Sequence, residues 1–303
     1  MTSVQKPSWR HHHAPQFYLS KWTDSKGELC LTRRVPTGKL IESQARPKST
    51  GYEEHLYSTP PTTPWERWAP GIVETSFLSP LDNAAALVHE KLLGAPGGVV
   101  DLDGADRLAW ARFLRSLMER HPRVLAQRDA RANQIAAERM ETYRAQFNSR
   151  RARRALDNFN FGAAAKMIVR NHMVQQIDDS VWLDALLNQE WLVLDAVDAD
   201  YITSDRPLLE NPWAPTSEDK TIYAMTLPLS ARRLFVTYPR SWAADPDWQQ
   251  VLAVLTSEVH NMVVVDSDPQ YLYSAKPIEN GKYAQLRTMV ERVFGCHGAD
   301  PSI

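Results

Sequence analysis

Apolar residues recur at helical spacing through the middle of the chain. Leu108, Phe113, Leu114 and Leu117 recur at helical spacing, and the last three fall on one side of a helix with 3.6 residues per turn. A helix is therefore expected to begin at Asp106 and to end near Pro122. The same spacing predicts further helices at 82–93, 124–147, 161–177 and 179–190. Segment 124–147 has a thin apolar stripe, so we expect it to be exposed.

Short apolar runs near both ends of the chain predict β-strands instead. Segments 28–34 and 40–45 flank the turn sequence Pro36-Thr37-Gly38-Lys39, which is typical of a hairpin. In the last third, strands are expected at 191–197, 221–227, 233–238 and 271–274. Pro228-Leu229-Ser230 is expected to join two of these strands. Helices are expected to return at 248–265 and 283–294.

Helices in the middle with strands at both ends predict an α+β fold. We expect a mostly helical lobe packed on a small sheet built from N- and C-terminal segments. The predicted organisation is one domain over residues 10–295, with a helical middle at 82–190 and disordered tails at 1–9 and 296–303. A chain of 303 residues buries about three quarters of its extended surface, so it needs no disulfide or metal in order to fold.

The cysteine content and the apolar runs indicate a cytoplasmic protein. The two cysteines, Cys30 and Cys296, lie near opposite ends and form no CxxC pair, which is typical of a reducing compartment. The first thirty residues contain no apolar signal core, and the longest apolar runs are far too short to span a bilayer. We therefore expect no membrane partner.

Charge is unevenly distributed along the chain. The formal net charge is −1, but Arg107 to Arg154 contains thirteen arginines, no lysine and four acids, a net of +9 that leaves −10 for the remainder. The guanidinium fork binds phosphate oxygens in pairs. This stretch is therefore a candidate site for a phosphate-containing ligand or nucleic acid, and the simpler interpretation is a solvated helix face.

Most familiar catalytic motifs are absent: the sequence contains no GxSxG, no GxGxxG, no Walker loop, no HExxH and no paired CxxC. The consecutive residues His11, His12 and His13 are the first candidates for chemistry, because imidazole binds transition metals and acts as a base near neutral pH. Adjacent side chains diverge, so the three cannot all face one ion. The alternative is a structural role, such as a helix cap.

Polar residues at the ends of predicted elements supply further candidates. Asp205 follows a predicted strand and is a candidate metal ligand or base, whereas Ser204 and Asp205 also fit a simple side-chain-to-backbone turn before Pro207. Arg120 falls where an apolar helix ends. Among the carboxylates, Glu74 and Asp82 lie close to a helix start, and Asp82 fits an N-cap.

Several of these residues form an ordered pattern. His11-His12 followed by Pro15-Gln16-Phe17-Tyr18-Leu19 opens it. Arg120-His121-Pro122, Ser204-Asp205-Arg206-Pro207, Pro228-Leu229-Ser230 and Asn261 follow in order. The pattern resembles the family called domain of unknown function 4238, over residues 10–275. The resemblance implies a shared pattern that includes His11, His12, Gln16, Arg120, Ser204, Asp205 and Asn261. It implies no particular activity.

We weigh three hypotheses for function. The leading one is a metal-dependent hydrolase acting on a phosphodiester or nucleotide. In it His12 and Asp205 hold a divalent metal or activate water, His11 assists, and Arg120 stabilises developing negative charge. The second is a non-catalytic interaction module of the bacterial conflict or defence type, in which the same residues lock the N-terminal segment in place. The third is an RNA-binding protein that uses Arg107 to Arg154.

Overall fold

The computed structural model describes residues 9–35, 40–66, 71–147, 149–197, 199–210, 224–267 and 269–278. The expected turn at 36–39, the closing helix at 283–294, the C-terminal tail and all of the N-terminal tail except Trp9 lie outside these residues. The described residues form an α+β fold of antiparallel sheets and helices, as the sequence predicts. None of their helices has the length and apolar character needed to cross a bilayer.

The largest sheet of the described residues is antiparallel and has the strand order β5-β6-β10-β9-β8. Its strands are β5 (Gly98–Val99), β6 (Glu190–Asp195), β10 (Arg233–Tyr238), β9 (Met225–Ser230) and β8 (Leu209–Glu210). Successive side chains of a strand point to opposite faces. Val193 and Phe235 belong to one hydrophobic cluster, and Leu192 and Val236 belong to another. The sheet is buried on both faces, which explains the continuous apolar runs in the sequence.

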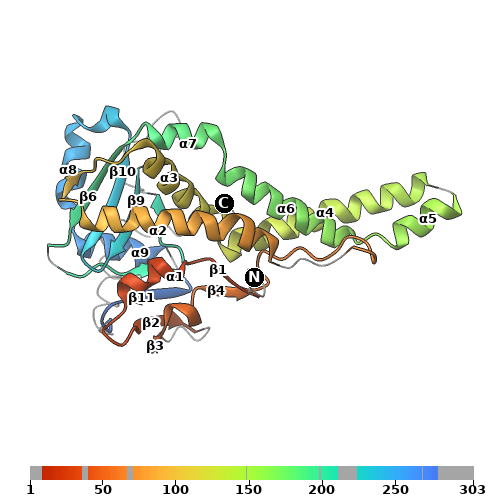
Figure 1. The fold of residues 1–303 in the computed structure, drawn as a ribbon, viewed down its shortest axis with the longest axis horizontal. Helices are drawn as coiled ribbons and strands as arrows, with labels where there is room; N and C mark the ends of the chain where they lie inside the picture. Colours follow the sequence, from red (N-terminus) through yellow and green to blue (C-terminus); the bar gives the residue numbers. More distant parts are fainter. Residues whose placement is uncertain are drawn as a thin grey trace, which may run out of the picture.

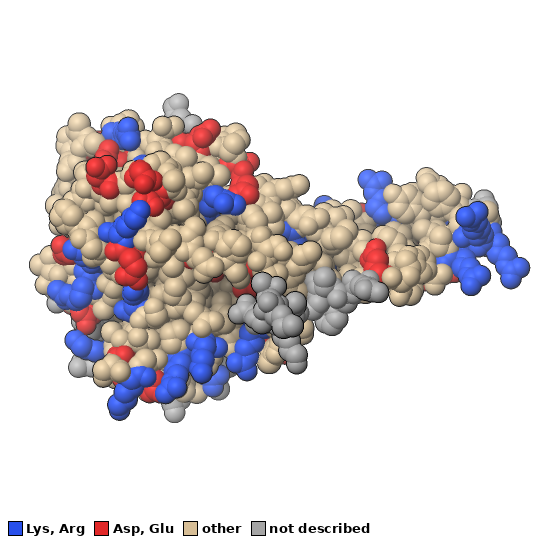
Figure 2. Space-filling view, viewed as in Figure 1, with Lys and Arg blue, Asp and Glu red and all other residues tan. Residues whose placement is uncertain are grey.

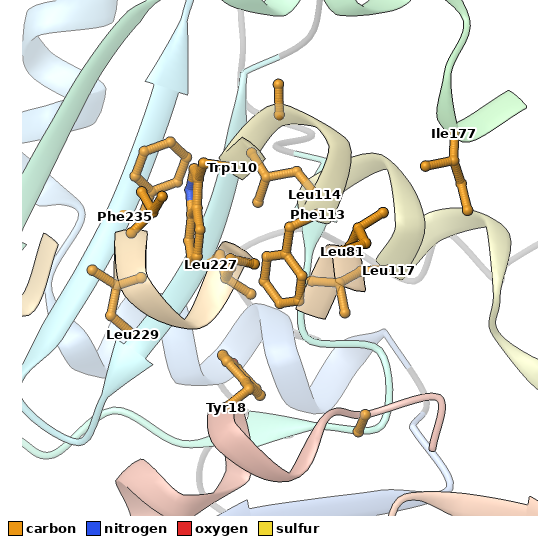
Figure 3. Packing of buried hydrophobic residues seen from close by; sticks show 14 of the residues in the cluster. Tyr18, Leu81, Trp110, Phe113, Leu114, Leu117, Ile177, Leu227, Leu229 and Phe235 are labelled. Atoms are coloured by element: carbon orange, nitrogen blue, oxygen red, sulfur yellow. The ribbon is translucent and has the colours of Figure 1, made fainter. Parts of the chain in front are cut away.

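Helices cover both faces of this sheet (Figure 1). On one face pack α2 (Ser79–Gly94) and α3 (Gly104–Glu119), and on the other packs α8 (Pro246–Val254) through Trp248. Figure 3 shows Trp110 and Phe113 of α3 directed at Leu227 and Phe235 of the sheet. The Trp110 and Phe235 ring centroids are 5.9 Å apart in an edge-to-face arrangement, which aromatic pairs favour.

A four-stranded antiparallel sheet, β3-β2-β11-β7, joins the N- and C-terminal parts of the chain, as expected. It contains β2 (Leu29–Arg34), β3 (Leu40–Ala45), β7 (Thr203–Ser204) and β11 (Tyr271–Ser274). Buried residues of α9 (Ser257–Asp266) form a hydrophobic cluster with Leu272 of β11. A separate two-stranded sheet pairs β1 (Arg10–His12) with β4 (Tyr52–Glu54). The strands therefore form several small sheets rather than the single one expected.

The opening motif fastens the N-terminal segment to both larger sheets. Short α1 (Gln16–Leu19) continues into a 3-10 turn (Ser20–Trp22). The Tyr18 hydroxyl donates to the Pro228 carbonyl at 2.8 Å and lies 2.7 Å from the Thr203 hydroxyl. Pro228 belongs to β9 and Thr203 to β7, so one fully buried side chain ties three distant segments together.

An arm of helices projects from the body (Figure 1). It consists of α4 (Pro122–Gln146), α5 (Arg150–Asp157) and α6 (Phe161–Ile177), and α7 (Ser180–Leu187) leads back to the large sheet. Only Leu125 of α4 is buried, as the thin apolar stripe predicts. Near the body, Arg170 of α6 donates to both carboxylate oxygens of Asp129 in α4 at 2.8 Å, which fastens the two helices together.

Two expected elements differ from the structure. Strand β9 runs to Ser230, so Pro228-Leu229-Ser230 lies inside it rather than linking two strands. Proline is tolerated there because, among the described residues, β8 pairs with β9 at Thr226 and Met225 and not at Pro228, so the missing N–H of Pro228 is not needed for that pairing. The helix expected at 248–265 is two helices, because the Thr256 side chain accepts the Val259 N–H and begins α9 anew.

Candidate functional site

A pocket of about 250 Å³ opens where several distant segments meet. Its lining comes from the residue after β1, from β4, from the first turn of α4, from the turn after β7 and from the start of β11. The lining residues are His13, Tyr52, Glu53, His121, Pro122, Arg123, Ala126, Asp205, Gln270 and Tyr271. The pocket brings together two imidazoles, two carboxylates and the N-terminal end of a long helix.

Asp205 is held in the pocket wall by the pairing of β7 with β11. Its backbone N–H donates to the Tyr271 carbonyl at 3.1 Å, and its Oδ1 accepts the Tyr271 N–H at 3.2 Å. Its Oδ2 lies 3.5 Å from His121 Nε2. Ser204 shapes this turn, because its hydroxyl accepts the Arg206 N–H at 3.1 Å. The expected side-chain-to-backbone turn is therefore present, and it directs Asp205 toward the pocket.

His121 is the N-cap of α4. The residue before a proline favours extended backbone, and His121 has ψ 136° in front of Pro122. Its Nδ1 accepts the Arg123 N–H at 3.2 Å, so in the neutral ring the proton is on Nε2, which faces Asp205. Both ring nitrogens of His121 are thus engaged with the protein, and His121 positions Asp205 rather than meeting a ligand itself.

His13 is the second imidazole of the pocket lining. Its side chain is 5% exposed, and its Nδ1 has no hydrogen-bond partner among the described residues. Its ring lies edge-on to His121, with the centroids 5.6 Å apart. Burial, followed by the neighbouring His121, lowers the pKa of His13 to about 3, while Asp205 acts in the opposite direction. His13 is therefore neutral at physiological pH.

The other two histidines of the opening motif lie in different surroundings. His11 is fully buried; its Nδ1 accepts the Tyr57 N–H at 2.9 Å, and its ring stacks on Tyr57. His12 contacts the Tyr52 ring, and its buried Nε2 has no partner within the described part of the chain. Burial, followed by the charge of Arg120, lowers the pKa of His12 to about 4. Asp205 thus shares its pocket with His13, whereas His12 is absent from the lining.

Arg120 occupies a buried polar cluster with two carboxylates. Its side chain is fully buried, and its Nη1 donates to the two oxygens of Asp82 at 2.9 and 3.1 Å. Its Nε and Nη2 have no hydrogen-bond partner in the described ranges, and neither does Oε2 of Glu74. Burial raises the pKa of Glu74 to about 7 and also raises that of Asp82, and Arg120 opposes both shifts. Asp82 is not the expected N-cap, because a π-helical turn (Glu74–Leu78) precedes α2 and places Asp82 inside the helix.

The remaining motif residues have structural surroundings or face solvent. The buried Asn261 accepts the Ile202 N–H at 2.9 Å and donates to the Asp200 carbonyl at 2.8 Å, so it clamps the segment before β7. Gln16 is exposed at the start of α1. No group of three or more His, Cys, Asp or Glu side chains suited to a metal ion occurs within the described ranges.

Comparison with known protein families identifies the family of this chain. A family model described as "Protein of unknown function (DUF4238)" matches residues 10–276, which is most of the chain. The chain belongs to this family. No curated protein and no solved structure matches it. The membership confirms the resemblance stated from the opening motif, and the family description names no activity.

Two pocket residues were given no role in the hypotheses drawn from the sequence. His13 was a candidate together with His11 and His12, but no local signal distinguishes it from its two neighbours. His121 had a detectable signal, because a polar residue directly before a proline at the start of a helix is a typical N-cap. That signal was missed because Pro122 was taken as the end of one helix rather than the first residue of the next.

Proposed function

We propose that this protein hydrolyses a phosphodiester or nucleotide in the pocket lined by His13, His121 and Asp205. The observation that carries the proposal is the state of His13. It is neutral and almost fully buried, its Nδ1 is unpartnered among the described residues, and it borders a pocket with a buried carboxylate. Buried polar atoms without a partner are rare in folded proteins, so this nitrogen is expected to meet a water or a ligand.

The pocket offers a site for an anion beside His13. The first turn of α4 contributes Pro122, Arg123 and Ala126 to the lining. The N-terminus of a helix carries a partial positive charge and attracts phosphate. The Arg123 side chain adds a full positive charge at the same wall. A phosphate group in this position lies next to the imidazole that is free to take a proton.

In the proposed reaction, Nδ1 of His13 takes a proton from a water molecule that attacks phosphorus. A bond from the water oxygen to phosphorus forms, the bond from phosphorus to the leaving oxygen breaks, and the leaving oxygen takes a proton from solvent. The Asp205 carboxylate stabilises the imidazolium that forms, in the direction in which it already raises the pKa of His13. General base catalysis of this kind contributes about 10²- to 10⁴-fold to the rate.

The other motif residues influence His13 without lining the pocket. The charge of Arg120 lowers the pKa of both His12 and His13 and helps keep both rings neutral. His11 fixes the strand that carries them, through Tyr57. A divalent ion bound by Asp205 and His13 would activate the same water. The described residues supply no third His, Cys, Asp or Glu ligand for such an ion, so the proposed reaction uses His13 alone as the base.

The test is turnover of a chromogenic phosphodiester and of a nucleotide panel by wild type, His13→Gln and Asp205→Asn. His172→Gln removes an exposed histidine and serves as the matched control. We expect a 10²- to 10⁴-fold loss of kcat in the two pocket variants and no change in the control. Circular dichroism verifies folding, and elemental analysis of the same samples tests for bound metal. Absence of turnover in wild type, or unchanged turnover in both pocket variants, contradicts the proposal.

A second candidate, the non-catalytic interaction module, is supported by the hydrogen bonds of the motif. Tyr18, His11 and Asn261 are buried and bonded across long sequence separations, as a purely structural motif would be. This candidate predicts no turnover by any sample and folded His13→Gln protein. The same set of variants therefore separates the two candidates.

A further inference from the structure

The arginine-rich stretch divides into two parts in the structure. In the part near the body, arginine side chains are engaged with the protein. Arg107 donates to the Leu187 and Gln189 carbonyls, Arg112 pairs with Asp178, and both Arg115 and Arg128 pair with Glu119. Together with Arg120, these residues hold the helices together. Apart from Arg123 in the pocket wall, the first half of the stretch is therefore structural rather than a surface for phosphates.

The second half lies at the end of the arm, where α5 has two distinct faces. Arg150, Arg151, Arg153 and Arg154 are exposed, and at 100° per residue they fall on one side of the helix. Ala152, Ala155 and Leu156 fall on the opposite side. Figure 2 shows basic side chains gathered at the end of the arm, far from the acidic side chains of the body.

The apolar side of α5 faces a hollow lined by aromatic rings. The hollow has a volume of about 540 Å³ and is lined by the three apolar residues of α5 with Tyr143, Phe147, Phe159 and Phe161. The rings contact one another, with the centroids of Phe159 and Phe161 4.9 Å apart. Tyr143, Phe147 and Phe159 are nevertheless 37%, 45% and 37% exposed. Partly exposed aromatic rings and an arginine face therefore lie at the same end of the arm, on opposite sides of α5.

We propose that the end of the arm, formed by α5 with Tyr143, Phe147 and Phe159, binds single-stranded nucleic acid. Arginine forks bind backbone phosphates, and exposed rings stack on bases of any sequence. A single strand that passes around the short helix α5 therefore uses both features. Helices that lie on membranes turn their apolar face toward the lipid, whereas the apolar face of α5 is directed into the hollow and its arginines outward. Double-stranded DNA would engage the arginines and leave the rings unused.

This inference goes beyond the proposed hydrolysis and does not depend on it. The pocket lies at the first turn of α4 and the arginine face follows its last turn, roughly 37 Å away at 1.5 Å per residue. Binding is measured without turnover, so the two proposals fail separately.

The test is fluorescence anisotropy with labelled oligo(dT) and oligo(U) between 50 and 200 mM KCl. Four phosphate contacts predict that affinity for a single strand falls about 50-fold over this range. The variant R150Q/R151Q/R153Q/R154Q is expected to bind at least tenfold more weakly. The control R33Q/R46Q/R232Q/R240Q removes the same charge from exposed positions on the body and is expected to bind within twofold of wild type. The variant F147L/F159L is expected to weaken binding while leaving the salt dependence unchanged.

Several results overturn the proposal. One is an equal loss of oligonucleotide affinity in the arm variant and in the body control variant, which would indicate a general charge effect. Others are absent oligonucleotide binding, or binding to phosphatidylserine vesicles or to an acidic peptide without binding to oligonucleotide. Circular dichroism and gel filtration check each variant. The double variant R150Q/R151Q, with an expected intermediate loss, provides the result if the fourfold variant does not fold.

Discussion

The Glu74 carboxyl lies half-buried beside Arg120 and Asp82, and its replacement by glutamine has a calculable effect on stability. Burial raises the pKa of Glu74 to about 7, although the charge of Arg120 opposes the shift. Glutamine keeps the shape of the side chain and cannot ionise. The variant Glu74→Gln therefore removes only the cost of a charge in this buried cluster.

The sign of the effect follows from the two pKa values. The carboxyl titrates near 4.5 in the unfolded chain and at about 7 in the folded protein, so between these values the folded protein retains a proton that the unfolded chain has lost. The contribution of Glu74 to stability therefore falls as pH rises from 4.5 to 7. At about 1.4 kcal/mol per pH unit, the loss reaches about 3 kcal/mol above pH 7. Glu74→Gln should be nearly neutral at pH 4.5 and stabilising by up to about 3 kcal/mol at pH 8.

Urea unfolding of wild type and Glu74→Gln at intervals from pH 4.5 to 8 measures this difference. Glu141→Gln is the control, because Glu141 is 71% exposed on the arm and should change the free energy of unfolding by less than about 0.5 kcal/mol. Buried histidines also make stability pH-dependent, but they are the same in both proteins and cancel in the difference. A stability difference that stays constant from pH 4.5 to 8 would refute the reasoning.

Two further changes test how the site is supported. Asn261→Ala leaves the Ile202 N–H and the Asp200 carbonyl without their side-chain partner, so thermal unfolding should show that the free energy of unfolding falls by about 2 to 4 kcal/mol. A fall of less than about 1 kcal/mol would contradict the role of Asn261 in holding the segment before β7. Asp129→Ala leaves the buried Arg170 guanidinium without its carboxylate and should destabilise the base of the arm by about 3 to 5 kcal/mol in urea unfolding. Adding Arg170→Met removes the unpaired charge and should restore part of the lost stability. A double variant that is as unstable as Asp129→Ala, or less stable, would contradict this explanation.

Elements set by local patterns were predicted well. Strand β10, strand β11 and helix α6 have the predicted bounds, because a short run of β-branched, apolar and aromatic residues or a 3.6-residue period is complete within each segment. The break between α8 and α9 was missed because Leu255 and Val259, on either side of Thr256, keep a helical spacing of four residues. The extension of β9 through Pro228 was missed because proline is excluded only where its N–H is needed, and that depends on the neighbouring strand.

The candidate site was predicted only in part, because its geometry depends on contacts between distant segments. Asp205 and the turn made by Ser204 were recognisable from local sequence. The partners of Asp205 were not, since they depend on the pairing of β7 with β11 and on the position of α4. The choice between His12 and His13 is decided by the direction of the chain as it leaves β1, and the pairing of β1 with β4 fixes that direction.

The central claim is that His13 is a neutral base whose ring meets an anion in the pocket. The most direct test is NMR titration of ring-labelled histidine, with the His13 signal assigned by its loss in His13→Gln and exposed His172 as internal control. We predict that His13 stays neutral down to about pH 4 in the free protein, because its pKa is about 3. A nucleoside monophosphate should then raise the pKa of His13 and leave that of His172 unchanged. A His13 signal that titrates near pH 6.5, or that does not respond to the nucleotide, would contradict the claim.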